Sequence, residues 1–437
     1  MSKLTRLTKT IFDSIADAGE KFLDSTKLRG TPVQELLLLS YDLISHKGLA
    51  SGIALARQVV SHYSVLNKKE KLEYFKELTK ITEIDIQEIK ARAEELYNNP
   101  TPETREKLNQ SLKTKFQKLF SRMNMAPEGT KAIVQLREDL LEFLPKHPEL
   151  KPLDVDLRTL LTTWFNPGFL SLEKIDWDTE ASILEKIIRY ETVHNIDNWN
   201  DLKQRLIKNR RCFAYFHPAL DDDPLIFVEV ALTKGIASSV QTILSDNGND
   251  IKRNTAIFYS INNCQRGLKR IPLGNFLIKM VATKIRQDNP DIKTFSSLSP
   301  VTGFAKWLNA ELNSKKSNLF EKEREALELA TKPGWHKDSK LSKKLKKPLM
   351  KACAHYLVNV KRGNKPLNSV ARFHFGNGAE LYRINWMGNS SAHGLADSFG
   401  IMVNYLYDLK NMEYNHENYM LNGGLAISKS VKGLLKE

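Results

Sequence analysis

The sequence predicts a protein of two parts, a helical bundle followed by an α/β domain built on a mostly antiparallel sheet. Apolar residues recur at helical spacing through the first third of the chain, and strand-like runs begin only after about residue 160. The length of 437 residues also exceeds what one hydrophobic core usually organises. We therefore expect a helical domain at residues 1–160 and a second domain at residues 161–437.

Amphipathic helices are the expected content of residues 5–165. In the segment NKKEKLEYFKELTKITEIDIQEIKARAEELYNN, the apolar positions recur at threes: Leu72, Phe75, Leu78 and Ile81. Another helix is expected to begin at Thr101, because a threonine followed by Pro102 is a helix-start signature. Its apolar row recurs at fours: Leu108, Leu112, Phe116 and Phe120.

Strands and hairpins are expected in the second part of the chain. Two apolar runs, 212–216 and 225–232, flank a loop rich in proline and aspartate and predict a buried hairpin. Further on, residues 255–261 predict a strand and residues 275–286 a helix. A later strand pair is expected at 369–375 and 380–386, on either side of the turn residues Gly376, Asn377 and Gly378.

Composition limits the class of protein. Apolar residues at 41% and charged residues at 27% are ordinary for a folded soluble chain, and no apolar run approaches the roughly 18 residues of a membrane span. The net charge of +15 indicates an anionic partner without identifying it. Seven lysines lie in residues 337–351, where a solvated helix face or a mobile insertion is expected.

The compartment and the absence of a metal site are also expectations from the residues. Only three cysteines occur, too far apart for metal-knuckle spacing, so we expect free thiols and a reducing environment: Cys212, Cys264 and Cys353. The amino terminus is not typical of a secretory signal, and the last three residues are not a peroxisomal address. We therefore expect a cytoplasmic protein.

The segment 256–285 joins a predicted strand to a predicted helix through glycines, with three cations nearby, Arg266, Lys269 and Arg270. Small residues at such a junction let backbone amides approach a phosphate, which a helix amino end favours. The pattern alone is weak, since many strand–turn–helix junctions bind nothing. Likewise, Ser296, Ser297 and Ser299 more often cap turns, and a lone histidine such as His374 is more often a core residue.

Three segments taken together carry more information: AIFYSINNCQRGLKRIPLGNFLIK, FSSLSPVTGFAKWL and ARFHFGNGAELYRINWM. In this order they resemble the signature segments of malonyl-CoA decarboxylases. The resemblance extends from about Trp164 to Tyr407 and more loosely over the helical part. It implies a helical oligomerisation domain followed by a catalytic domain similar in fold to the N-acetyltransferase superfamily (GNAT-like).

The resemblance also implies a set of site residues. The serine before the proline of SSLSP is Ser299 and the histidine of R-F-H is His374, which together form the family's catalytic pair. The family's CoA loop, beside Arg266, corresponds to Lys269, Arg270, Ile271, Pro272, Leu273, Gly274 and Asn275. Pro272 stands where some members carry an acid, so no acid role is assigned there. The implied ligands are malonyl-CoA and acetyl-CoA, with no metal or prosthetic group, and the implied assembly is a homo-oligomer, a tetramer.

Loss of CO2 from a malonyl thioester leaves an enolate, so the site must stabilise an oxyanion and supply a proton to the α-carbon. We expect Ser299 and His374 to be hydrogen-bonded, with Ser299 orienting the carboxylate or relaying the proton and His374 acting as the acid.

Other functions stay open from the residues. An acyltransferase would use the same CoA loop but would need an amine acceptor. An RNA-binding or scaffold protein would exploit the positive charge, yet no aromatic-basic motif is present, and we expect no nucleic-acid partner. A serine hydrolase is disfavoured because no G-x-S-x-G elbow occurs.

Overall fold

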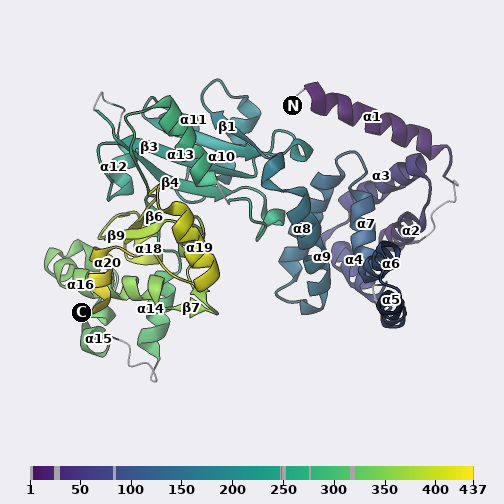
Figure 1. Cartoon of the computed structure of the whole chain (residues 1–437). Helices are drawn as coiled ribbons and strands as arrows, with labels where there is room; N and C mark the ends of the chain where they lie inside the picture. Colours follow the sequence, from purple (N-terminus) through teal and green to yellow (C-terminus); the bar gives the residue numbers. More distant parts are fainter. Residues whose placement is uncertain are drawn as a thin grey trace. The chain divides into compact units, whose positions relative to one another are not determined.

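The computed structural model of the protein describes residues 3–23, 30–81, 85–246, 248, 252–274, 277–314 and 320–436 (Figure 1). The described residues form two compact units. The first comprises Met1–Ser171 with two later segments, Tyr215–Leu225 and Asn263–Leu273. The second comprises Leu172–Ala214, Ile226–Asn262 and Gly274–Glu437. The domain boundary between residues 160 and 161 stays a prediction.

The amino-terminal part is helical, as predicted, and is drawn in purple to blue in Figure 1. Its helices are α1 (Lys3–Glu20), α2 (Pro32–Ser45), α3 (Leu49–Val65), α4 (Lys68–Ile81), α5 (Ile86–Asn98), α6 (Pro102–Leu112), α7 (Lys115–Met123), α8 (Gly129–Phe143) and α9 (Lys151–Trp164). Apolar side chains from several of these helices are fully buried, for example Phe75, Phe120 and Leu140. Burial of such apolar stripes is the main source of their stability.

The expected helix from Thr101 begins where predicted but is two helices. Thr101 caps α6, and its side chain accepts a hydrogen bond from the Thr104 N–H. The helix is then interrupted, and Thr114 caps the start of α7. The Thr114 hydroxyl accepts a hydrogen bond from the Gln117 N–H and donates one to Asp156 over 2.6 Å. A second capping residue therefore starts α7 where the apolar spacing alone suggested continuity.

The second half of the chain forms an eight-stranded mixed sheet, in the order β1-β2-β3-β4-β5-β10-β6, with β9 also paired to β10. The strands are β1 (Ser171–Ile175), β2 (Arg210–Phe216), β3 (Ile226–Thr233), β4 (Thr255–Asn263), β5 (Thr294–Ser297), β6 (Ser299–Pro300), β9 (Glu380–Asn385) and β10 (Met402–Leu406). β4 and β5 are parallel, whereas β10 is antiparallel to β5, β6 and β9. Along β3 and β4 nearly every residue is buried, which indicates strands covered on both faces.

Helices and a small hairpin accompany this sheet. The helices are α10 (Ala181–Tyr190), α11 (Trp199–Arg205), α12 (Val240–Leu244), α13 (Leu277–Asp288), α14 (Phe304–Asn313), α15 (Arg324–Leu329), α16 (Ser339–Val358), α17 (Ser369–Gly376), α18 (Ala392–Ser398), α19 (Met412–Asn422) and α20 (Lys429–Lys436). A separate two-stranded sheet joins β7 (Lys361–Arg362) to β8 (Lys365–Pro366). The predicted hairpin is confirmed as β2 and β3, the strand at 255–261 as β4, and the helix at 275–286 as α13 within the described residues.

The strand expected at 369–375 is wrong, because these residues form helix α17. The turn residues Gly376, Asn377 and Gly378 suggested a strand on each side of them, but Asn368 caps a helix, because its side chain accepts a hydrogen bond from the Ala371 N–H. The buried residues then fall at Ala371, His374 and Phe375, which is the spacing of one helix face. The following element, β9, is a strand as predicted.

The lysine-rich segment forms part of α16, so the solvated helix face is confirmed there. Lys343 and Lys344 are exposed, whereas Leu345 and Leu349 on the opposite face are fully buried. None of the described helices combines the length and the apolar character that crossing a bilayer requires.

Candidate active site

Ser299 lies where the chain passes from strand β5 to strand β6. β5 ends at Ser297, the Leu298 N–H donates to the Phe258 carbonyl over 2.9 Å, and Ser299 then begins the short strand β6 opposite Val403 of β10. Ser299 is only 6% exposed. The strand pairing therefore holds its hydroxyl inside the protein rather than on a surface turn.

His374 lies in the last turn of α17 and is 2% exposed. The helix ends just beyond it, where Asn377 donates its backbone N–H to the carbonyls of Phe373 and His374. Gly378 then adopts a φ of +75°, a conformation that L side chains rarely adopt. The helix cap and this turn therefore fix the position of the imidazole.

The structure brings the two predicted catalytic residues together, although 75 positions separate them in the chain. Ser299 Oγ and His374 Nε2 are 2.8 Å apart, and the Ser299 hydroxyl donates to Ser297 Oγ over 2.9 Å. A serine hydroxyl has one hydrogen, so with that hydrogen given to Ser297, Nε2–H of His374 is the donor to Ser299. The predicted hydrogen bond between them is present.

Two tyrosines that the sequence analysis missed complete the surroundings of His374. The Tyr407 hydroxyl lies 2.5 Å from Nδ1 of His374, which accepts its hydrogen in the tautomer given above. The Tyr405 ring stacks on the imidazole, with 4.2 Å between ring centroids and 16° between planes. Tyr405 lies within β10, and Tyr407 directly follows the last residue of that strand, Leu406, so both come from one segment of the chain. Their alternate spacing in NYLY was the one signal that could have found them.

Burial sets the charge state of this group of side chains. It lowers the pKa of His374 from 6.5 to about 3, so the ring is neutral at neutral pH. Burial also raises the pKa values of Tyr405 and Tyr407 well above 10, so both keep their hydrogens. The hydrogen-bonded chain from Ser299 through His374 to Tyr407 therefore consists of neutral groups.

The predicted CoA loop is divided between the two compact units after Leu273. In the first unit, Arg266, Lys269, Arg270 and Pro272 are exposed, whereas Ile271 and Leu273 are buried. Arg270 has a φ of +69°, a left-handed backbone that non-glycine residues seldom adopt. Three exposed cations are therefore available to an anionic ligand.

The second unit holds the end of the loop. A Cβ added at Gly274 would lie 2.6 Å from Cε2 of Phe373, the residue before His374, so only glycine fits there without a shift of the ring. Asn275, also predicted in the loop, lies outside the described residues. Gly274 therefore packs directly beside the helix that carries His374.

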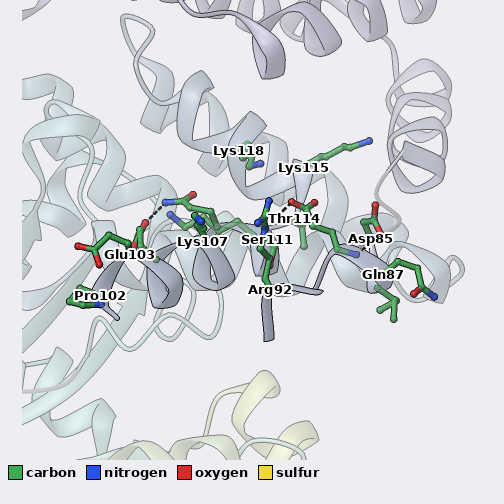
Figure 2. A pocket seen from close by; sticks show the side chains of 15 residues that line it. Asp85, Gln87, Arg92, Pro102, Glu103, Lys107, Ser111, Thr114, Lys115 and Lys118 are labelled. Carbon is green, nitrogen blue, oxygen red and sulfur yellow. Dashed lines mark hydrogen bonds and ion pairs between the residues drawn. The ribbon is translucent and has the colours of Figure 1, made fainter. Parts of the chain in front are cut away.

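A hollow in the helical unit contains none of the predicted site residues. It lies among α5, α6 and the start of α7, and Figure 2 shows its lining, which includes Arg92, Glu103, Lys107 and Lys118. Charges of both signs line it, so it offers no selective site for an anion. In the part of the chain that the structure describes, no group of three His, Cys, Asp or Glu side chains is placed to hold a metal ion.

A buried, hydrogen-bonded serine–histidine pair is an arrangement that enzymes use, and comparisons with known proteins identify the class of enzyme. Residues 168–437 match the family model "Malonyl-CoA decarboxylase C-terminal domain", and residues 83–165 match "Malonyl-CoA decarboxylase N-terminal domain". The chain therefore belongs to the malonyl-CoA decarboxylase family, whose members are carboxy-lyases, and the predicted resemblance is confirmed.

Individual members of this family are similar to the chain over most of its length. The chain is 37% identical over 386 residues to the malonyl-CoA decarboxylase, mitochondrial, of Anser anser anser, covering 82% of this chain and 77% of that protein. The crystal structure of malonyl-CoA decarboxylase from Rhodopseudomonas palustris is 42% identical with a TM-score of 0.87, covering 92% and 99% of the two chains. The enzyme from Agrobacterium vitis is 39% identical with a TM-score of 0.86, covering 92% and 100%. The predicted helical part and α/β domain are thus confirmed, with a mixed sheet in the second part, while the likeness to N-acetyltransferases stays a prediction.

Proposed function

We propose that this protein converts malonyl-CoA to acetyl-CoA and CO2, with Ser299 and His374 as its catalytic pair. The observation that carries the proposal is the 2.8 Å hydrogen bond between Ser299 Oγ and His374 Nε2, in the protein interior of a chain of the malonyl-CoA decarboxylase family. Two polar groups from distant segments are seldom buried together without a structural or chemical reason.

The reaction requires the protein to stabilise an enolate oxygen and to supply a proton to the α-carbon. When the bond between the α-carbon and the carboxylate breaks, its electron pair moves into the thioester carbonyl and CO2 leaves. Hydrogen-bond donors aimed at the resulting enolate oxygen are each worth roughly 3–4 kcal/mol in other enzymes. The α-carbon then takes one proton, so each turnover consumes one proton. In this proposal His374 delivers that proton, and Ser299 orients the malonyl carboxylate or relays the proton.

The charge of the substrate explains how a buried histidine becomes an acid. Burial alone lowers the pKa of His374 to about 3. A malonyl carboxylate bound beside the ring would favour the imidazolium and raise this pKa again, because opposite charges stabilise each other strongly away from water. A relay from neutral Tyr407 is less favourable, because burial raises the pKa of its hydroxyl well above 10. Substrate binding is therefore coupled to the uptake of a proton by His374.

The loop beside Arg266 is proposed to bind the CoA part of the substrate. Lys269 and Arg270 are the cations for the phosphates, and both are exposed. The remaining members, Ile271, Pro272, Leu273, Gly274 and Asn275, are proposed to shape the loop rather than supply charge. The fit of Gly274 against Phe373 supports a position for the end of this loop beside the helix that carries His374.

Three further features of the function are proposals. No metal or prosthetic group is required, because the thioester itself accepts the electron pair. A homo-tetramer is proposed from the family resemblance. A cytoplasmic location is proposed because the sequence has only three cysteines, which fits a reducing compartment. Since the goose and rat relatives are named mitochondrial, cell fractionation is the test that separates the two locations.

Product analysis tests the function. Purified protein is mixed with malonyl-CoA in the presence of a metal chelator, and the products are followed by mass spectrometry. We expect acetyl-CoA and CO2 in equal amounts without an added acceptor. A malonyl group found only on an added amine would instead identify an acyltransferase and reject the proposal.

A further inference from the structure

Arg137 of helix α8 is fully buried, with no exposed surface, although an arginine carries a permanent charge. Its Nε–H donates to Asp154 of α9 over 2.9 Å, which forms a buried ion pair. Burial lowers the pKa of Arg137, and the nearby Asp154 carboxylate opposes that shift. Such a pair is costly to bury, and its presence needs a reason beyond packing.

The rest of the guanidinium is directed to the loop of residues 266–273, which belongs to the same compact unit. Nη1 donates to the carbonyl of Gly267, and Nη2 donates to the carbonyl of Lys269 over 3.0 Å. One rigid planar group therefore connects two loop carbonyls to a carboxylate on α9. A lysine, with a single ammonium at the end of a flexible chain, cannot reproduce these three directions.

The loop also lies directly against the α8 backbone. A Cβ added at Gly267 would lie 2.0 Å from the carbonyl oxygen of Val134, so glycine is required for this approach. On its amino-terminal side the loop is tied to the β2–β3 connection, where Cys264 N–H donates to the Leu225 carbonyl over 2.9 Å and the Gln265 side chain donates to Pro224 over 3.0 Å. Both ends of the segment before Lys269 are thus held.

The two exposed cations come just after these anchors. Arg270 follows the Lys269 carbonyl that Arg137 holds, and its left-handed backbone, φ +69°, is sustained only where neighbouring bonds fix it. Phosphate recognition depends on such preorganisation, because a mobile loop would lose conformational entropy on binding. The anchor and the cations are therefore adjacent parts of one arrangement.

We infer that Arg137 is a positioning residue, through which the helical part of the protein holds Lys269 and Arg270 in place for the phosphates of the substrate. The inference rests on the proposed function of the loop. It assigns to α8 and α9 a part in substrate binding, although neither helix touches the reacting atoms in this scheme.

The test is Arg137→Lys, which keeps the charge but loses the planar set of donors. We expect the KM for malonyl-CoA to rise about 10-fold while kcat stays within about twofold, since one preorganised charged contact is worth about that much. With malonyl-pantetheine, which carries the malonyl thioester without the nucleotide phosphates, parent and variant should have equal kcat/KM. Arg122→Lys is the matched control, because Arg122 also donates to backbone carbonyls, those of Leu43 and His46, but not to the loop. It should leave both substrates unaffected.

The outcomes separate this inference from the proposed function. A parent protein that decarboxylates neither substrate overturns both. A parent that is active but prefers malonyl-CoA no more than malonyl-pantetheine also overturns both the loop assignment and the inference. If the parent discriminates and Arg137→Lys weakens both substrates equally, only the inference fails. Should Arg137→Lys not fold, Asp154→Asn, which removes the carboxylate that orients Arg137, must show the same selective rise in KM, and its absence rejects the inference.

Discussion

The catalytic pair and the cationic loop differ in nearly every physical respect. Ser299 and His374 are buried, neutral and fixed by hydrogen bonds to Ser297 and Tyr407, whereas Lys269 and Arg270 are exposed and charged. Proton transfer is faster in a buried site that excludes water and fixes the position of each hydrogen, because electrostatic interactions are stronger there. Phosphate binding is favoured by exposed cations, which also attract the anionic ligand from a distance. The difference indicates which kinetic constant each region controls.

The largest expected effect comes from the buried pair. Replacing His374 by glutamine removes the proposed acid, so kcat for malonyl-CoA should fall about 10²- to 10⁴-fold with little change in KM. His355→Gln is the control, because His355 is also partly buried and stacks on Trp307, in contacts separate from the pair. Steady-state decarboxylation assays measure both variants. Near-normal turnover in the His374→Gln variant would reject His374 as the catalytic acid.

The exposed loop should show the opposite pattern. Lys269→Ala combined with Arg270→Ala removes two cations proposed for the phosphates, so KM should rise roughly 10- to 100-fold with kcat nearly unchanged. The matched control is Lys343→Ala with Lys344→Ala, an exposed lysine pair on α16 that removes the same charge. Initial rates at several substrate and salt concentrations measure the effect. A fall in kcat without a change in KM contradicts this division of roles.

Burial of His374 also predicts a stability effect. The native ring stays neutral down to its pKa of about 3, whereas the unfolded chain protonates it near 6.5. Between these values the unfolded state binds more protons, so the free energy of unfolding falls as pH falls, by up to about 1.4 kcal/mol per pH unit from this ring.

Denaturant titrations at pH 7 and pH 5 measure that contribution. His374→Gln should lose about 2 kcal/mol less stability over this interval than the parent, because the variant has no ring to protonate on unfolding. Equal losses in parent and His374→Gln would show that the histidine is already charged in the native protein.

The smallest expected effect is at the tyrosine behind the histidine. Tyr407→Phe removes the hydroxyl at Nδ1 of His374 and keeps the ring, so kcat should fall about 3- to 10-fold, the worth of one neutral hydrogen bond. Tyr414→Phe, at a position 72% exposed, is the control and should have no effect. Single-turnover measurements separate the chemical step from product release. A normal rate in Tyr407→Phe would assign that tyrosine to packing alone.

The sequence by itself determined the order of the parts and most of their elements. Helical spacing predicted the amino-terminal helices, the apolar runs predicted β2, β3 and β4, and three signature segments carried the family together with Ser299 and His374. These features depend on residue type and local periodicity, which the chain displays directly. For the lysine-rich segment, composition left a solvated helix face and a mobile insertion open, and the structure has the helix face in α16.

Other features were decided only by the tertiary structure. Residues 369–375 precede a glycine-containing turn yet form α17 rather than a strand, because the Asn368 cap and one buried face outweigh the local pattern. Tyr405 and Tyr407 reach His374 only through side-chain contacts between the β10 segment and helix α17, and Arg137 reaches Gly267 across 130 positions of the chain. The physical reason is the same in each case: a contact between distant residues depends on how whole elements pack, and no local spacing in the chain records it.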